Sequence, residues 1–400
     1  NLFYPRSVAS DALGNVYIAD QNNNRVRKVN AAGIISTFAG TGTPGYNGDG
    51  GLAINARLNA PEQVAVDAFG NVYIAEWGNS VIRKVGTNGT INTIAGGGTV
   101  FPGDGGLATN ALISAPKGIA VDAAGNLFFS DYFNNKIRKI NVSGIISTYA
   151  GTGAAGFSGD GGLAINAQVN GPKELAVDAS GNLYFADGGN IRIRKINPSG
   201  IMFTIAGIGV LGFTGDGTAA TSAQISYPNG VAVDSISNVY FGDGNRVRKV
   251  NPSGVISTIA GTGAGGYSGD GASPLNAQFN YPSGVNVDVF GNILIADRFN
   301  NRVREICTVA CLVNIKKLTD IEDKILISPN PNKGLFNLQI DDDIKNGTLI
   351  LINSIGQKVY EQEITQGSND IIANGLPRGI YNCVVIQDKW QINSGRILIE

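Results

Sequence analysis

The sequence predicts an all-β protein, a six-bladed β-propeller followed by a small β-sandwich. A motif of Asp, two residues, Gly (once Ser) and Asn occurs six times at intervals of 54 to 56 residues. Glycine supplies 56 of the 400 residues, about twice the average share of roughly 7%. A period of this length indicates one supersecondary unit repeated around a ring or stack. The motif begins at Asp11, Asp67, Asp122, Asp178, Asp234 and Asp288.

Each repeat predicts four short strands. In the third repeat, runs rich in Val, Ile, Phe and Tyr extend from Pro116 to Asp122, Asn126 to Asp131, Lys136 to Asn141 and Ile145 to Gly151. The motif joins the first two runs by a turn, in which the Asp side chain caps amides and the Gly takes positive φ. The runs are continuously apolar, which indicates strands buried on both faces, as in propeller blades.

Composition removes several function classes. The chain contains no histidine, which excludes Ser-His-Asp and Cys-His catalysis and imidazole-ligated zinc. Its net charge of -1 predicts no general attraction to nucleic acid, and its Arg-x-Arg-Lys stretches are interpreted as ion-pairing groups because they recur once per repeat beside equally many acids. No apolar run approaches the roughly 18 residues of a transmembrane segment.

The sixth repeat lacks its fourth strand. It retains Val285 to Asp288, Asn292 to Asp297 and Arg302 to Ile306, but not the Ile-Ser-Thr-x-Ala-Gly run of the other five. We expect residues upstream of Asn1 to supply a closing strand; otherwise Thr308 to Val313 must form it.

A long Gly-rich loop joins consecutive repeats. An aromatic residue precedes an Asp by three positions in each loop, and a Leu-Ala-x-Asn-Ala run or a variant follows. We predict that the aromatic packs the loop onto its blade and that the Asp caps a short helical turn. These pairs are Tyr46 and Asp49, Phe101 and Asp104, Phe157 and Asp160, Phe213 and Asp216, and Tyr267 and Asp270.

Strand alternation places these loops at the same end of the propeller as the turns between second and third strands. Those turns carry an acid and an Asn in every repeat, so this end is the candidate binding face. The acids serve either as structural caps and ion-pair partners or as ligands for calcium or a substrate. The candidate ligand-binding residues are Asp20, Asn24, Glu76, Asn79, Asp131, Asn135, Asp187, Asn190, Asp243, Asn245, Asp297 and Asn301.

The repeat resembles that of NHL-repeat propellers. Its fourth copy reads Pro172 to Asp178, Gly181-Asn182, Ala186-Asp187 and Arg192 to Lys195, and the resemblance covers residues 5 to 306. It implies a propeller but no single activity, because such propellers serve as binding platforms, lyases and lactonases.

Residues 325 to 400, after a linker over 307 to 324, predict a β-sandwich from alternating apolar positions. Their motifs resemble the type IX (Por) secretion C-terminal sorting domain of Bacteroidota, although Arg396 stands where that family usually has Lys. The resemblance implies a partner, the type IX machinery, and export across the outer membrane to the cell surface or medium. The residues that carry it are Pro329, Asn330, Pro331, Gly334, Gly356, Tyr360, Leu376, Pro377, Gly379, Tyr381 and Arg396.

The three cysteines are too few for a disulfide scaffold. Cys307 and Cys311 form either a local bridge or two thiols, and Cys383 stands apart. The leading functional hypothesis is a propeller that binds a protein or glycan, with aromatics and Asp or Asn side chains suited to sugar stacking and hydroxyl recognition. The alternatives are a calcium-dependent lactonase or lyase, in which calcium is the cofactor, and a spacer or adhesin without a discrete pocket.

Overall fold

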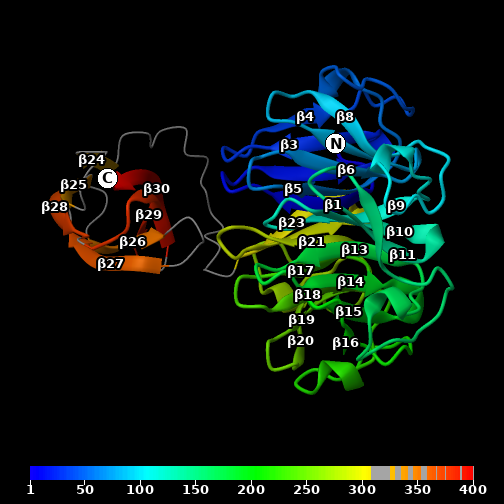
Figure 1. Cartoon of the computed structure of the whole chain (residues 1–400). Helices are drawn as coiled ribbons and strands as arrows, with labels where there is room; N and C mark the ends of the chain where they lie inside the picture. Colours follow the sequence, from blue (N-terminus) through cyan, green and yellow to red (C-terminus); the bar gives the residue numbers. More distant parts are fainter. Residues whose placement is uncertain are drawn as a thin grey trace. The chain divides into compact units, whose positions relative to one another are not determined.

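The computed structural model describes residues 1–307, 325–328, 335–340, 346–352, 358–365, 367–373, 375–387 and 390–399. The chain divides into two compact units (Figure 1). The first covers residues 1–288 and 293–306, and the second contains residues 307–400. Within the described residues, no helix has the length and apolar character needed to cross a membrane.

The first unit is a six-bladed propeller, as predicted. Blade one consists of β1 (Pro5–Ser10), β2 (Val16–Asp20), β3 (Arg25–Val29) and β4 (Ile35–Ala39), paired antiparallel in that order. Blades two and three consist of β5 (Pro61–Val66), β6 (Val72–Glu76), β7 (Val81–Val85) and β8 (Ile91–Gly96), and of β9 (Pro116–Val121), β10 (Leu127–Asp131), β11 (Lys136–Ile140) and β12 (Ile146–Ala150). Blades four to six consist of β13 (Pro172–Val177), β14 (Leu183–Asp187), β15 (Arg192–Ile196) and β16 (Met202–Ala206), of β17 (Val231–Val233), β18 (Val239–Asp243), β19 (Arg246–Val250) and β20 (Ile256–Ala260), and of β21 (Pro282–Val287), β22 (Ile293–Asp297) and β23 (Arg302–Ile306).

The first strands of the blades surround the axis and close the ring. Each contacts the first strand of the next blade, and β21 of blade six contacts β1 of blade one. At the same junction, the Tyr4 amide donates to Asn301 Oδ1 over 2.8 Å. Blade six has three strands among the described residues, as the sequence predicts, and Thr308 to Val313 lie outside that part of the chain.

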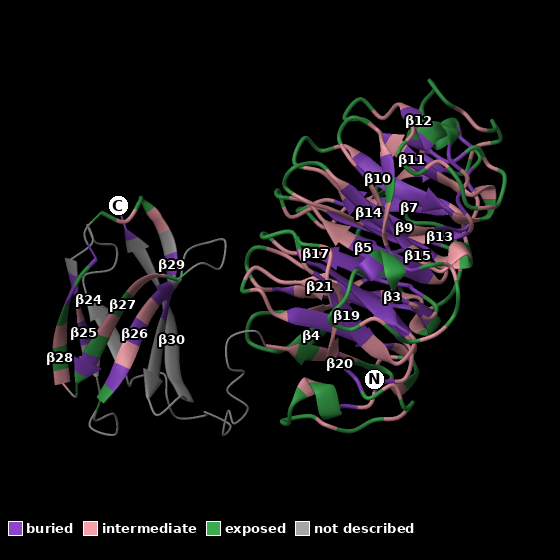
Figure 2. Cartoon of the chain, turned by 90° about the horizontal axis from the view of Figure 1, so that it is seen from below, coloured by how far each residue is buried: buried purple, intermediate pink, exposed green. Residues whose placement is uncertain are grey.

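The core lies between neighbouring blades (Figure 2). The cluster between blades four and five joins Tyr184 and Ile193 to Val231 and Phe241, all buried. Because each blade packs on both sides, its strands are buried on both faces, which explains their continuous apolar runs.

The repeated Asp-Gly-Asn motif forms the predicted turn. In blade four, Asp178 Oδ1 accepts the amides of Ser180 (3.0 Å) and Asn182 (2.8 Å), and Gly181 has φ +80°. Asp178 Oδ2 accepts the Asn182 side-chain amide and the Tyr184 hydroxyl. Burial, and then the charge of Asp178, raise the pKa of Tyr184. The motif is therefore a structural turn that also fixes a core tyrosine.

Each linking loop contains the predicted helical turn as a single 3₁₀ turn. Leu163 precedes the turn of blade four, and no side chain caps it. The predicted Asp cap is wrong because the carboxylate of Asp160 binds Arg194 instead. The loop turns are η2 (Ala53–Asn55), η3 (Ala108–Asn110), η5 (Ala164–Asn166), η7 (Ala220–Ser222) and η8 (Pro274–Asn276). Four more lie between second and third strands: η1 (Gln21–Asn23), η4 (Tyr132–Asn134), η6 (Gly188–Asn190) and η9 (Arg298–Asn300).

The second unit has two antiparallel sheets, in agreement with the predicted sandwich. One sheet has the order β24-β25-β28 and the other β27-β26-β29-β30. One core joins Phe336 and Ile371 of the first sheet to Leu349, Leu351 and Ile364 of the second. The strands are β24 (Ile325–Ser328), β25 (Leu335–Ile340), β26 (Asn346–Ile352), β27 (Lys358–Thr365), β28 (Gly367–Ile372), β29 (Gly379–Gln387) and β30 (Trp390–Ile399).

Candidate functional site: the long-loop end of the propeller

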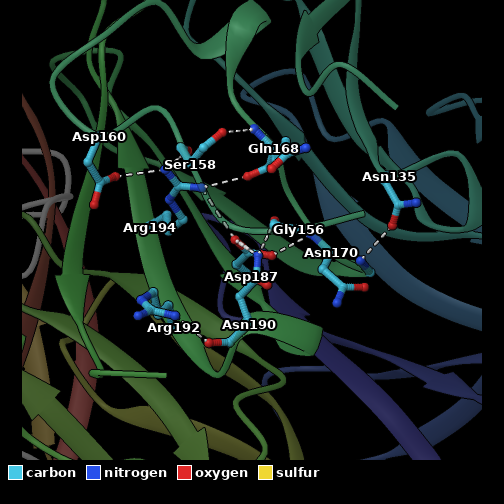
Figure 3. Close-up of polar contacts among 11 residues, drawn as sticks. Asn135, Gly156, Ser158, Asp160, Gln168, Asn170, Asp187, Asn190, Arg192 and Arg194 are labelled. Atoms are coloured by element: carbon cyan, nitrogen blue, oxygen red, sulfur yellow. Dashed lines mark hydrogen bonds and ion pairs between the residues drawn. The ribbon is translucent and has the colours of Figure 1, made fainter. Parts of the chain in front are cut away.

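The six predicted acids of the second-to-third strand turns are buried. Each has at most 1% of its surface exposed. In blade four, Asp187 Oδ1 accepts the Asn170 amide at 2.8 Å, and Oδ2 accepts the Asn190 side-chain amide at 2.8 Å (Figure 3). Arg194 Nη1 reaches Asp187 Oδ2 at 3.4 Å. Protein donors therefore occupy both carboxylate oxygens.

The same arginine ties the acid to the linking loop. Arg194 Nη2 donates to Asp160 Oδ1 at 2.7 Å and to the Ser158 carbonyl at 2.8 Å (Figure 3). Arg194 itself is fully buried. We call this set of loop acid, arginine and turn acid the arginine network. Its members are Asp49, Arg83 and Glu76; Asp104, Arg138 and Asp131; Asp160, Arg194 and Asp187; Asp216, Arg248 and Asp243; and Asp270, Arg304 and Asp297.

The loop aromatics pack onto the blade that follows them. The guanidinium of Arg192 lies 3.6 Å from the ring centre of Phe157, and that of Arg194 lies 5.0 Å away. Stacked cations and rings of this kind hold the loop in place. The other pairs are Tyr46 with Arg83, Phe101 with Lys136, Phe213 with Arg246 and Tyr267 with Arg302.

The predicted asparagines occupy two different positions. Asn190 donates both to the turn acid and to the Gly156 carbonyl of the loop, and Asn79 does the same in blade two. Asn135 instead has φ +50° and accepts the Gly171 amide of the next blade at 3.0 Å. Asn24, Asn245 and Asn301 make the same link to the amides of Ala60, Tyr281 and Tyr4.

Burial sets the electrostatics of the turn acids. It raises the pKa of Glu76 to about 7 and that of Asp243 to about 6, against the lowering effect of the paired arginines. Calcium requires several convergent oxygens that are free to coordinate. The described residues contain no group of three Asp, Glu, Cys or His side chains that could hold a metal. The oxygens of the turn acids already accept N–H groups, so this donor set does not fit calcium.

Blade five departs from the repeat. Between its second and third strands it has two residues, Gly244 and Asn245, where every other blade has four. The 3₁₀ turn and its acid-binding Asn are therefore missing, and Ser226 Oγ donates to the Gly212 carbonyl in place of that Asn. A pocket of about 350 Å³ occupies this place.

Aromatic and polar groups line this pocket, which we call the blade-five pocket. Tyr227, with 53% of its surface exposed, Tyr281 and Phe213 supply ring faces, and Asn245 and Arg246 supply polar groups. The complete lining is Phe213, Ser226, Tyr227, Asp243, Gly244, Asn245, Arg246, Gly263 and Tyr281. Two of the predicted ligand-binding residues, Asp243 and Asn245, thus line a cavity.

Charged side chains gather around the propeller axis at the same end. The position after the repeated Pro holds five different residue types over the six blades. We call the group formed there and in the adjoining turns the axis mouth. Sequence reasoning missed it, although a signal was present: the Pro repeats in all six blades, whereas the residue after it varies. The position reads Arg6, Glu62, Lys117, Lys173, Asn229 and Ser283; with Gln21 and Arg298 of the turns, the first four form the axis mouth.

Contacts across blades tie the axis mouth together. Arg6 Nη2 lies 3.0 Å from Glu62 Oε1, and Gln21 bonds to both side chains. Lys173 Nζ donates to the Pro228 carbonyl at 3.2 Å, and Lys117 Nζ lies 3.7 Å from the Tyr132 ring centre. Burial, and then the charges of Lys117 and Arg6, lower the pKa of Lys173 to about 8.

Side chains and backbone of the first strands fill the propeller axis beneath the axis mouth. Gln63 Oε1 accepts the Ile119 amide at 2.6 Å, and Gln63 Nε2 donates to the Leu175 carbonyl at 3.3 Å, so one side chain spans three blades. A Cβ atom on Gly118 would lie 2.1 Å from the Lys173 carbonyl oxygen, so only glycine fits there. Burial raises the pKa of Glu174 well above its usual value.

Three of the described sorting-motif residues pack in the sandwich core. Tyr381 is buried, and its hydroxyl donates to the Pro377 carbonyl at 2.5 Å. Tyr360 and Leu376 pack against the same core. Gly379 begins β29, and Arg396 lies in β30 opposite Asn382. Pro329, Asn330, Pro331 and Gly334 lie outside the described residues, as does Gly356.

Cys307 is disulfide-bonded, whereas Cys383 is a buried free thiol. Burial raises the pKa of Cys383 to about 12, which makes it an inert core residue. Cys311, the other half of the local bridge considered from the sequence, lies outside the described residues.

Comparison with known proteins agrees with both units. The teneurin NHL domain model matches residues 42–101, 99–157, 152–214 and 211–265, and the NHL repeat model matches residues 4–29. Mouse teneurin-4 is 32% identical over 218 residues, which are 48% of this chain and 8% of teneurin-4. The chain thus spans under a tenth of the length of this relative.

Two solved structures share the fold. A protein of unknown function from Bacteroides thetaiotaomicron has a TM-score of 0.57 and 23% identity, over 76% of this chain and 69% of that one. An auxiliary nutrient binding protein from the same organism has a TM-score of 0.55 and 15% identity, over 76% and 69%.

The C-terminal unit has its own family. The secretion system C-terminal sorting domain model matches residues 326–400, which shows export to the cell surface or the medium through the type IX machinery. With the propeller matches covering more than half of the chain, the protein belongs to the teneurin-type NHL-repeat propellers and carries a secretion sorting domain.

Proposed function

We propose that the exported propeller is a glycan-binding module and that its ligand enters the blade-five pocket. The observation that carries this proposal is the short turn at Gly244 and Asn245, where a cavity of about 350 Å³ lies in a blade whose turn is two residues shorter than that of the other five. This volume falls within the usual range of roughly 300–1,000 Å³ for small-molecule sites.

The lining supports a sugar. Tyr227 and Tyr281 supply aromatic rings of the kind that stack on pyranose rings, and Arg246 supplies N–H groups for hydroxyl recognition. Asn245 serves instead to hold Tyr281 and Gly263 in place, because both of its side-chain polar atoms bond to their backbone. The nutrient-binding structure with the same fold supports a binding role for an exported propeller of this kind. The calcium-dependent lactonase or lyase stays an untested prediction. The described residues contain no acid cluster that favours it.

Glycan-array binding by the full chain tests this proposal. Replacing Tyr227 by Ala removes a half-exposed ring from the pocket, so sugar binding should weaken by about tenfold or more. Phe69→Ala is the matched control. Phe69 is 82% exposed in the turn between β5 and β6 of blade two, at the end of the propeller opposite to the pocket. If both variants lose sugar binding equally, or if neither does, the sugar does not bind in the blade-five pocket. If the wild-type chain binds no sugar, the proposed function is wrong.

A further inference from the structure

The axis mouth carries more positive than negative charge. Arg6, Lys117, Lys173 and Arg298 converge there, and their charges act on one another and on Glu62. Glu62 is committed to Arg6 at 3.0 Å and to Gln21 at 2.8 Å. Glu174, the neighbour of Lys173, is the other carboxyl in electrostatic range, and burial raises its pKa and so favours its neutral form. The two lysines and Arg298 are therefore the cations for which the mouth offers least compensation.

The cost of this arrangement points to a ligand. Burial disfavours the charged forms of Lys117, Lys173 and Arg298 alike. Like charges gathered in a partly buried site destabilise the fold unless an anion joins them. Other blades show that the fold does not need them, because blades five and six have Asn229 and Ser283 at the lysine position.

The axis mouth and the blade-five pocket are adjacent. Lys173 Nζ donates to the carbonyl of Pro228, the residue directly after Tyr227 of the pocket. Tyr281 of the pocket lies under Arg298, with 5.9 Å between guanidinium and ring centre. It also lies within electrostatic range of Arg6, Tyr132 and Tyr227. A sugar stacked on these tyrosines would thus hold a substituent toward the cations.

From this geometry we infer that the propeller prefers an acidic glycan, whose uronate-type carboxylate binds Lys117, Lys173 and Arg298 while its ring occupies the blade-five pocket. The inference rests on the proposed function and names its ligand class. Arg6 is already paired with Glu62, which leaves Lys117, Lys173 and Arg298 to meet the carboxylate. Its hydrogen bonds to cations are of the strong, charge-assisted kind.

The test compares trigalacturonate with its methyl ester, which keeps the sugar rings but replaces each carboxylate by an uncharged ester, by calorimetric titration of the full chain. We expect the acid to bind about tenfold more tightly. Lys117→Met/Lys173→Met should abolish that preference while it keeps binding of the methyl ester. Lys195→Met is the control, since Lys195 stacks over Tyr184 between blades. Thermal melts establish that each variant is folded.

Each other outcome overturns the inference. Equal binding of acid and ester refutes the carboxylate assignment but leaves a neutral-glycan module intact. A preference that survives the double lysine variant places the anion elsewhere. Displacement of trigalacturonate by inorganic phosphate at matched ionic strength shows an unspecific anion site. Binding of neither sugar refutes the acidic class, and the array result with Tyr227→Ala then decides the proposed function separately.

Discussion

The arginine network and the axis mouth lie at the same end of the same repeat and follow opposite rules. The network repeats an arginine between two acids in five blades, with the shorter contact at 2.5 to 2.7 Å in each. The arginine is buried in four of them and partly exposed, as Arg304, in blade six. The axis mouth places Arg, Glu, Lys, Lys, Asn and Ser at one repeated position. The residues that repeat in the blades are those that hold each linking loop. The residues that differ between blades are the ones that can give a ring of similar blades a single ligand site.

The strongest test of the network compares Arg194 of blade four with the equivalent Arg27 of blade one, which has no acid partner in the network. Arg194→Ala removes the partner of a buried carboxylate, so the free energy of unfolding should fall by about 3–5 kcal/mol. Arg27 occupies the same strand position but donates to the Ser36 carbonyl and is partly exposed, so Arg27→Ala should cost under about 1 kcal/mol. Urea unfolding measures both. Similar costs would mean that the network does not stabilise the blades.

A turn graft tests the pocket. Replacing Gly244 and Asn245 by the four-residue turn of blade four, Gly-Gly-Asn-Ile, restores the regular blade and fills the cavity. Sugar binding should then fall by at least about tenfold, with the melting temperature unchanged within a few degrees. Retained affinity in a folded graft would show that the irregular turn is unrelated to binding.

The pH dependence of acidic-sugar binding tests the mouth. Lys173, packed among Lys117 of β9, Arg6 of β1, Glu62 of β5 and its neighbour Glu174, has a pKa lowered to about 8. Its charge is present below that pH and lost above it, so affinity for trigalacturonate should fall severalfold from pH 7 to pH 9.

The contribution of Lys173 to the free energy of unfolding changes with pH in the opposite direction to the affinity. An unfolded lysine keeps its proton to about pH 10.4, so the unfolded state binds more protons between pH 8 and that value, and Lys173 makes the fold more stable as pH rises. In Lys173→Met both trends should shrink. An affinity that stays constant from pH 7 to pH 9 in the wild-type chain would contradict a role for this ammonium group.

The smallest effect concerns a missing link between blades. Ile191 stands where Asn135 links blade three to blade four, and it has φ +55°, a conformation that costs a β-branched residue roughly 1–2 kcal/mol. Ile191→Asn should relieve that strain and raise the unfolding free energy by about 1 kcal/mol. The reverse exchange, Asn135→Ile, should lower it by a similar amount, and denaturant titration of both would expose any disagreement.

Much of this architecture follows from the sequence. The six-fold motif determined the blade count, because the Asp-Gly-Asn turn is a local structure that needs only its own residues. Continuous apolar runs such as Leu183 to Phe185 determined burial on both faces, and the Ser-Pro-Asn-Pro and Leu-Pro-x-Gly-Ile-Tyr motifs identified the exported sandwich. Local hydrogen bonding and side-chain period carry this information along the chain.

Only the tertiary structure decided what the polar residues do. Asp187 and Asp160 are 27 positions apart in sequence and look equally solvent-facing, yet Arg194 joins them and buries one. Lys117 and Lys173 meet because closure of the ring brings first strands together around one axis. Charge interactions depend on distance and burial in three dimensions, which a repeat pattern does not contain. The sequence indicated ion pairing for the Arg-x-Arg-Lys stretches, but only the structure shows which acids each arginine joins and that the two lysines meet at the axis.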